Sequence, residues 1–164
     1  MTSAAGDGLR EVHILGFPVR IQARAQEHLD DLLREFMLIA ADDDRGPASR
    51  VPGQLLDLIA EIQRDYAETS LEQEARLMEA REAGMESIDL VYRVPPGAAA
   101  IAMRLAEALD AADTYCLSGE HLLTLATPRE EKDFRRWYLG QFVDQISGSR
   151  PTAWSDWIAD PQKQ

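Results

Sequence analysis

Three short apolar segments, each typical of a β-strand, end at a proline that is followed by an amphipathic helical pattern. They are residues 12–18, 88–95 and 122–128. Proline fixes φ near its helical value, lacks the N–H that a helix start leaves unpaired, and favours extended geometry in the preceding residue. Strand–proline–helix is therefore a stable local unit. Three such units predict an α/β (α+β) domain, with a small three-stranded sheet covered by four to five helices.

Apolar residues recur with helical spacing over several stretches, which predicts that helices take up more than half of the chain. The stretches are 20–41, 52–68, 71–83, 98–112 and 129–146. Ser70 and the glutamine three positions later have capping-box spacing, so a new helix is expected to begin at Leu71. In that helix we expect Leu71, Ala75 and Met78 to face inward. Tyr66 falls on the apolar face of the preceding helix, and Tyr92 alternates with polar neighbours on the inward face of the second strand.

The chain is long enough to form one domain with a core of its own. We expect residues 1–10 to be a flexible N-terminus and residues 11–150 to form a single domain. Residues 151–164 contain Trp154 and Trp157. Disordered tails are poor in large aromatic residues, so we expect this aromatic tail to dock on the domain.

The net charge of −12 restricts the partners that the protein can have. Nucleic-acid backbones and anionic membrane surfaces both require clustered cations, so neither is an expected partner. No apolar run approaches the roughly 20 residues of a membrane span, and no signal peptide is expected. The single cysteine, Cys116, rules out an intramolecular disulfide and suits a reducing cytoplasm. Composition thus predicts a cytoplasmic protein.

Common catalytic motifs are missing from the sequence. It contains no glycine-rich phosphate-binding loop, no G-x-S-x-G elbow, and no cysteine pair with zinc spacing. These absences argue against the most frequent nucleotide-binding, hydrolase and zinc-binding interpretations. We expect no cofactor, and no residue is singled out as catalytic.

One candidate metal site lies on the first predicted helix. His28, Asp31 and Glu35 are spaced i, i+3 and i+7, so they share one face and would present an imidazole and two carboxylates. Metal sites in helical bundles need matching ligands from other helices, and no second set of this kind is visible. A solvated helix face is the favoured interpretation, and a metal site is the alternative.

A second candidate site combines cations and aromatic residues near the C-terminus. Tryptophan, tyrosine and arginine dominate the energetics of protein interfaces. The apolar stripe of residues 129–146 is also too wide for a single packing face. The candidate protein-interaction residues are Arg135, Arg136, Trp137, Tyr138, Trp154 and Trp157. The alternative is that these aromatic residues fill a small core and hold the tail in place.

Several segments resemble an uncharacterised actinobacterial family of small cytoplasmic proteins. The similarity covers residues 12–157, and its motifs are His13–Arg20, Glu27–His28, Arg34–Phe36, Asp89–Pro95, Leu122–Pro128 and Phe134–Leu139. Members of this family tend to be encoded near serine phosphatases and anti-sigma ATPases of the partner-switching type. The resemblance implies a regulatory role, and it provides no catalytic residues to carry over.

These observations favour a non-enzymatic cytoplasmic protein that acts by binding a protein partner, as an accessory to bacterial partner-switching in stress or developmental signalling. The alternative is a metal- or small-ligand-binding enzyme that uses the face formed by His28, Asp31 and Glu35. A small sheet leaves two edges and one face open, so a homodimer is compatible with the pattern.

Overall fold

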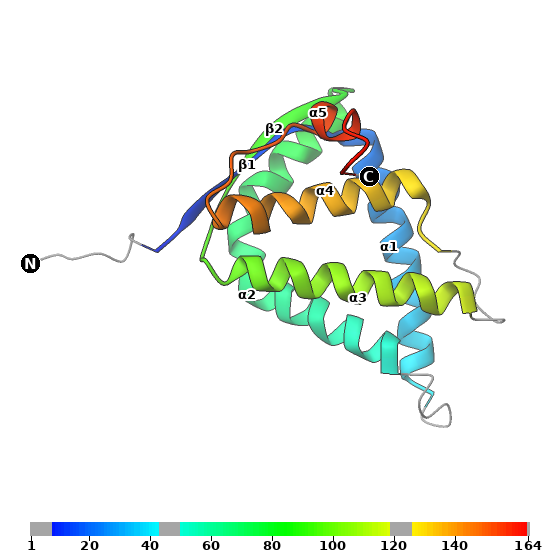
Figure 1. Cartoon of the computed structure of the whole chain (residues 1–164). Coiled ribbons are helices and arrows are strands. Elements are labelled where there is room, and N and C mark those ends of the chain that lie inside the picture. The colour runs from blue at the N-terminus through cyan, green and yellow to red at the C-terminus, as the bar shows by residue number, and fades with distance from the viewer. Residues whose placement is uncertain (1–7, 43–49, 119–125, 164) are drawn as a thin grey trace, which may run out of the picture.

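A computed structural model describes residues 8–42, 50–118 and 126–163, which contain two strands and five helices (Figure 1). The elements are β1 (Arg10–Pro18), α1 (Val19–Ala40), α2 (Arg50–Glu82), β2 (Ser87–Val94), α3 (Ala98–Ser118), α4 (Arg129–Ile146) and α5 (Trp154–Ile158). Helices take up more than half of the chain, so the helix-rich α+β prediction is confirmed.

The sheet of the described residues has two antiparallel strands, in which Ile14 lies opposite Leu90. A bulge follows Ile14, where Gly16 adopts a left-handed φ of 66° and its amide donates to Asp89 Oδ1 at 2.7 Å. The predicted three-stranded sheet is not confirmed. Most of the third expected strand, 122–125, lies outside the described residues, and residues 126–128 form no strand.

Proline marks the helix starts as the sequence pattern predicted. Pro18 is extended (φ −79°, ψ 102°), and α1 begins at the next residue. The carbonyl of Pro95 accepts a hydrogen bond from the amide of Ala98 at 3.0 Å, which opens α3. Pro128 precedes α4, with φ −57° and ψ 154°. The strand–proline–helix unit is therefore present in full twice, and the proline–helix half a third time.

Helix α2 runs for 33 residues without the break that was predicted at Ser70. The Ser70 hydroxyl lies 3.2 Å from the carbonyl oxygen of Ala67 and 3.0 Å from the carboxylate of Glu74. It therefore bonds within one helix and does not cap a second one. The helix ends at Glu82, and Gly84 (φ 68°) supplies the left-handed residue that commonly follows a helix.

The inward face predicted for the second half of α2 is wrong. Leu71 and Met78 are 61% and 62% exposed, and Ala75 between them is exposed as well. The buried face carries Gln73 and Ala80 and packs on β2. The apolar stripe of Leu71, Ala75 and Met78, here called the α2 stripe, therefore faces away from the core. Helical spacing predicted an apolar stripe on this helix, but it could not show whether another element packs against that stripe.

Glutamine side chains bond to the outer edges of both strands. The side-chain amide of Gln145 on α4 donates to the carbonyl of His13 at 2.8 Å and accepts from its amide at 2.9 Å. On the other edge, the amide of Gln73 donates to the carbonyl of Val91. His13 and Val91 lie opposite each other in the ribbon. At this register, neither edge is free to pair with a second copy of the chain.

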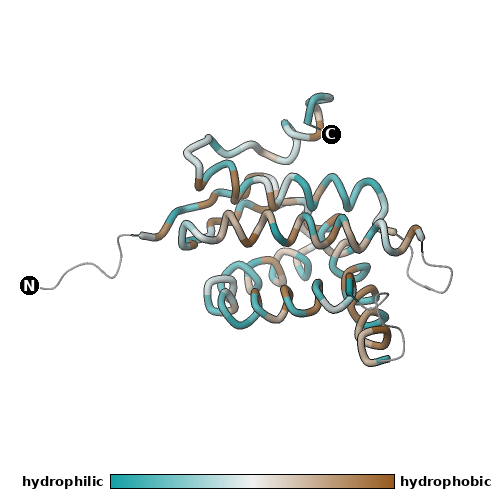
Figure 2. Tube along the Cα trace, turned by 60° about the horizontal axis from the view of Figure 1, so that its bottom comes forward, coloured by the Kyte–Doolittle hydropathy of each residue, from teal (hydrophilic) through white to brown (hydrophobic). Residues whose placement is uncertain are grey.

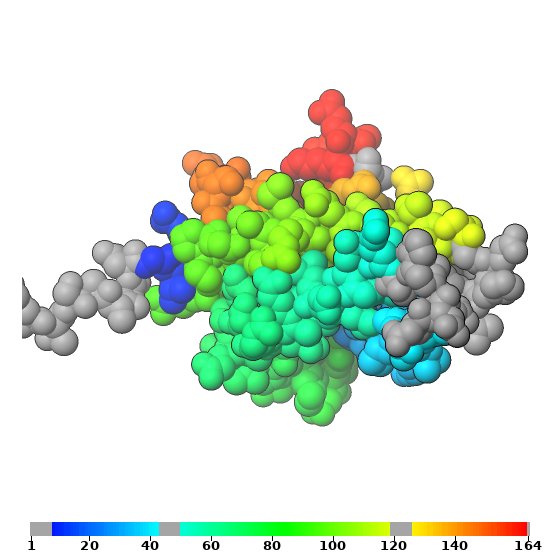
Figure 3. Space-filling model, turned by 90° about the horizontal axis from the view of Figure 1, so that it is seen from below, coloured from blue at the N-terminus to red at the C-terminus, as the bar shows by residue number. Residues whose placement is uncertain are grey.

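The buried residues form two clusters. The first lies beneath the sheet and includes Val12, Ile14, Leu90, Phe134, Trp137 and Trp157. The second joins α1, α2 and α3 through Leu32, Phe36, Leu55, Leu109 and Ala112. Hydrophobic and hydrophilic residues alternate along the long helices in Figure 2. Figure 3 shows α2 and α3 side by side, and α3 also packs on α4.

A buried carboxylate connects α3 to the segment before α4. Asp113 is 4% exposed and accepts hydrogen bonds from the amide of Thr127 (2.9 Å), from its hydroxyl (2.6 Å) and from the Arg135 guanidinium (2.8 Å). Burial by itself raises the pKa of Asp113, but these hydrogen bonds and the positive charge of Arg135 outweigh it. The pKa therefore lies below the ordinary value.

Candidate functional site

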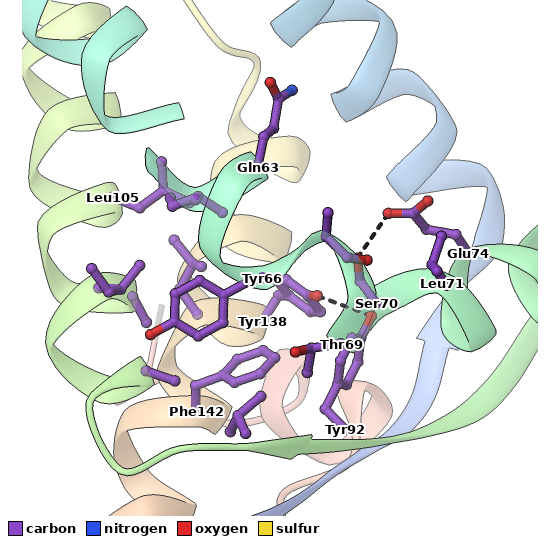
Figure 4. Close-up of a pocket in the computed structure, with 17 residues that line it drawn as sticks. Gln63, Tyr66, Thr69, Ser70, Leu71, Glu74, Tyr92, Leu105, Tyr138 and Phe142 are labelled. Atoms are coloured by element: carbon purple, nitrogen blue, oxygen red, sulfur yellow. Dashed lines mark hydrogen bonds between the residues drawn. The ribbon is translucent and has the colours of Figure 1, made fainter. Parts of the chain in front are cut away.

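A pocket of about 330 Å³ lies where the middle of α2 passes β2, α3 and α4 (Figure 4). Its apolar floor includes Ile101 and Leu105 of α3 and Leu139 of α4. Short side chains leave the space open, among them Ala67 on α2 and Ala102 on α3. Pockets for small molecules are typically apolar concavities with a few convergent polar groups, and this pocket matches that description.

Aromatic rings from three elements form one wall of the pocket: Tyr66 on α2, Tyr92 on β2, and Tyr138 and Phe142 on α4. The rings of Tyr92 and Tyr138 each lie 5.3 Å from that of Phe142, with edge-to-face geometry. These contacts hold the rings in a fixed arrangement. Tyr66, Tyr92 and Tyr138 also pack against the first buried cluster, so the wall continues into the core.

Polar groups gather at one side of this wall. The hydroxyl of Tyr138 donates to that of Tyr92 at 3.1 Å, and Ser70 bonds to Glu74 on the adjacent turn of α2. Figure 4 shows Ser70 and Glu74 on one side of the rings and Leu105 on the other. Among the described residues that line the pocket, Glu74 alone has a charged side chain. The pocket is therefore amphipathic, with one negative charge at its polar side.

The acidities of the two phenols reflect this environment. Burial raises the pKa of Tyr92, the hydrogen bond from Tyr138 opposes this in part, and the negative charge of Glu74 raises it further. Burial likewise raises the pKa of Tyr138 well above its ordinary value, with additional contributions from Tyr92 and Glu74. Both phenols are therefore protonated and uncharged at neutral pH. They can donate or accept hydrogen bonds there but cannot supply a negative charge.

The predicted interaction residues are for the most part packed inside the fold. Trp137 is fully buried, and its indole N–H donates to the carbonyl of Thr152 at 2.8 Å. Trp154 lies 5.4 Å from Trp137 and stacks on the buried Trp157 at 5.7 Å. The aromatic tail therefore lies against α4, and in this conformation Trp137 and Trp157 present no surface to a partner.

The remaining members of that set are divided between two hollows, with Arg135 and Arg136 in one and Tyr138 in the other. Arg135 pairs with Asp110 and Asp113. The exposed Arg136 lines the same hollow between α3 and α4 as Arg135. Tyr138 faces the pocket. The structure thus brings the aromatic members together with the core and leaves Arg136 as the exposed member of the set.

The predicted metal-binding set does not come together. Asp31 pairs with Arg34 at 3.2 Å on the exposed side of α1. The Nε2 atom of His28 is buried without a hydrogen-bond partner among the described residues. Over residues 8–42, 50–118 and 126–163, no three His, Cys, Asp or Glu side chains are arranged to hold a metal ion. Within the described residues, the elements packed against α1 therefore supply no ligands that would complete a metal site with His28, Asp31 and Glu35.

The lone cysteine is not an exposed nucleophile. Cys116 is buried in the second cluster, and burial raises the pKa of its thiol to about 11, with smaller contributions from Asp113 and Glu35. The thiol is therefore protonated at neutral pH, and the thiolate is the reactive form.

Sequence reasoning did not identify the pocket. It placed Tyr66 and Tyr92 inward, and these two inward tyrosines were the available signal, because a buried phenol needs a hydrogen-bond partner. Ser70 was assigned to a helix start, and Glu74 was not linked to the tyrosines. Ser70 and Glu74 lie together at the pocket because α2 continues past β2.

Comparisons with protein-family models, curated proteins and solved structures found no match to this chain. The family resemblance described above therefore stays a prediction. Within the described residues, the helices are too short or too polar to cross a lipid bilayer.

Proposed function

We propose that this chain is a regulatory binding protein that holds a small, mainly apolar molecule in the pocket between α2, β2, α3 and α4. The observation that carries this proposal is the pocket itself, which combines an aromatic wall, an apolar floor and a few polar groups. The regulatory and cytoplasmic setting is supported by the family resemblance and by the lack of common catalytic motifs.

The size of the pocket limits the ligand. A cavity of about 150 Å³ accommodates a benzene ring, so about 330 Å³ suits one or two fused rings with a short substituent, roughly a dozen non-hydrogen atoms. The apolar residues of α3 would contact the rings. The two phenols and Ser70 would orient the substituent by hydrogen bonding.

Tryptophol, an uncharged indole alcohol, is a suitable probe for this proposal. We expect it to raise the melting temperature and to perturb the ring resonances of Tyr66, Tyr92 and Tyr138 in NMR spectra. Ala67→Phe places a ring at the pocket and should abolish both effects. Ala75→Phe makes the same change on an exposed position of α2 outside the pocket, so binding should persist. Equal binding by both variants would contradict the proposal.

A protein-interaction role is the second candidate, and exposure of the α2 stripe is the observation that favours it. Exposed charged residues flank the stripe, and the acidic ones (Glu72, Glu74, Glu79 and Glu82) outnumber the basic ones (Arg76 and Arg81). Two copies meeting here would set like charges against each other. The charge pattern instead fits a basic amphipathic helix of another protein.

Synthetic peptides can test this second candidate. An amphipathic leucine–lysine helix should bind the protein, and a leucine–glutamate helix of the same length should not. Met78→Ser should weaken the lysine peptide about tenfold, since it removes one buried apolar side chain from the complex. Met103→Ser, at an exposed methionine of α3, is the matched control. Equal affinity for both variants would show that only unspecific charge attraction is involved.

A further inference from the structure

We infer that the pocket selects a small hydrophobic amine, that is, one or two apolar rings bearing a protonated amino group on a short arm. This inference rests on the proposed binding function and specifies its ligand class. It depends on three properties of the pocket. These are the sign of its charge, the aromatic rings of its wall, and the position of the charged group relative to those rings.

The charge of the pocket is negative and has one source. Among 17 lining residues, Glu74 alone is charged. Its carboxylate lies 3.0 Å from the Ser70 hydroxyl, and its field reaches the rings, because it raises the pKa of both Tyr92 and Tyr138. The net charge of −12 adds a further unfavourable potential for anions. A carboxylate ligand would therefore be repelled at the polar side, and a cation attracted.

The aromatic wall suits the same ligand. An ammonium group over the face of a tyrosine or phenylalanine is attracted by the ring quadrupole, and the attraction is stronger where water is excluded. Tyr66, Tyr92, Tyr138 and Phe142 offer four rings at one wall. The phenol oxygens also carry lone pairs that accept hydrogen bonds, and an ammonium group provides only donors.

The arrangement of these groups sets the shape of the ligand. Glu74 and Ser70 project from α2 on one side of the rings, while Leu105 lies on the opposite side (Figure 4). A ligand that places its amine near Glu74 therefore directs its apolar part toward α3. A purely polar cation would leave the apolar floor unfilled, and a purely apolar ligand would leave Glu74 unpaired.

Three indoles with similar shapes test the inference: tryptamine (cationic), tryptophol (neutral) and indole-3-acetate (anionic), each titrated calorimetrically into the full chain. We expect tryptamine to bind about tenfold more tightly than tryptophol, and indole-3-acetate to bind most weakly. Raising the salt concentration should reduce the difference, because Glu74 is exposed at the pocket side.

Glu74→Gln should remove the preference for tryptamine, so that tryptamine and tryptophol bind this variant with similar affinity. Glu72→Gln changes the net charge equally, at an exposed α2 position that does not line this pocket, and should preserve the preference. Equal affinity of the wild type for all three indoles would overturn the amine inference and leave the proposed pocket function standing. If none of the three binds, the proposed function itself fails, and the inference fails with it. A preference for indole-3-acetate would also overturn the inference.

Discussion

Replacing Asp113 with asparagine tests how strongly one buried carboxylate fixes α4 to α3. The substitution preserves the shape of the side chain and one oxygen for Thr127, but it removes the charge that faces Arg135 at 2.8 Å. A hydrogen bond to a charged group contributes about 1.5–3 kcal/mol when buried, so we expect Asp113→Asn to lower the free energy of unfolding by about 2 kcal/mol at pH 7.

A matched control is available on the same arginine. Asp110 accepts a hydrogen bond from Arg135 at 2.7 Å, yet its side chain is 72% exposed. Exposed ion pairs contribute about 0–1 kcal/mol, so Asp110→Asn should cost less than half as much as Asp113→Asn. Urea unfolding of the two variants and the wild type measures both values. Equal costs would refute the argument that burial makes the Asp113 interaction strong.

The pH dependence provides a second check with a defined sign. The pKa of Asp113 lies below its ordinary value in the folded chain, so the unfolded chain binds its proton more readily. The stabilisation is therefore present above the unfolded pKa of about 3.9 and is lost as the pH falls through the folded pKa. The stability difference between wild type and Asp113→Asn should stay constant from pH 7 to about 5 and shrink below about 4. A difference that grew in acid would contradict the assignment.

Two further predictions concern the tail and the sheet edge. Deleting residues 151–164 removes the buried Trp157 and the carbonyl that pairs with Trp137, so the melting temperature should fall by about 5–10 °C, measured by circular dichroism; an unchanged value would show that the tail is not part of the fold. Gln145→Ala leaves the amide and carbonyl of His13 without their side-chain partner and should cost about 1–3 kcal/mol in urea unfolding. Gln145→Glu can accept from that amide but cannot donate to the carbonyl, so it should recover only part of the loss.

Local sequence patterns predicted the elements that depend on local chemistry. Proline fixes backbone geometry within one or two residues, so the ends of β1 and β2 and the starts of the following helices were predictable from Pro18 and Pro95. The helix break predicted at Ser70 is wrong, because the same local sequence allows the Ser70 hydroxyl to form either of two hydrogen bonds. It can cap a new helix or bond back to the carbonyl of Ala67, and only the packing of α2 on β2 decides between them.

Which side of a helix is buried was less predictable. Periodicity locates an apolar stripe along the helix, but it does not identify the element that packs against that stripe. In the second half of α2 the buried face carries Gln73, whose side-chain NH₂ donates to the carbonyl of Val91, while apolar Leu71 and Met78 stay exposed. A polar residue that bonds to a strand edge can thus outcompete an apolar stripe for the inward position. No pattern within α2 itself contains this information, since the partner lies in a different element.

The same long-range contact explains why the pocket exists. Gln73 holds the middle of α2 against the edge of β2. Ser70, one turn before Gln73, and Glu74, the next residue after it, both line the pocket with Tyr92. Had α2 broken at Ser70, the second half could have turned its apolar stripe inward and filled the space beside Tyr138. Because α2 is continuous, Leu71, Ala75 and Met78 stay exposed. The aromatic wall of the pocket stays uncovered for the same reason. The pocket and the exposed stripe are two consequences of a single packing choice.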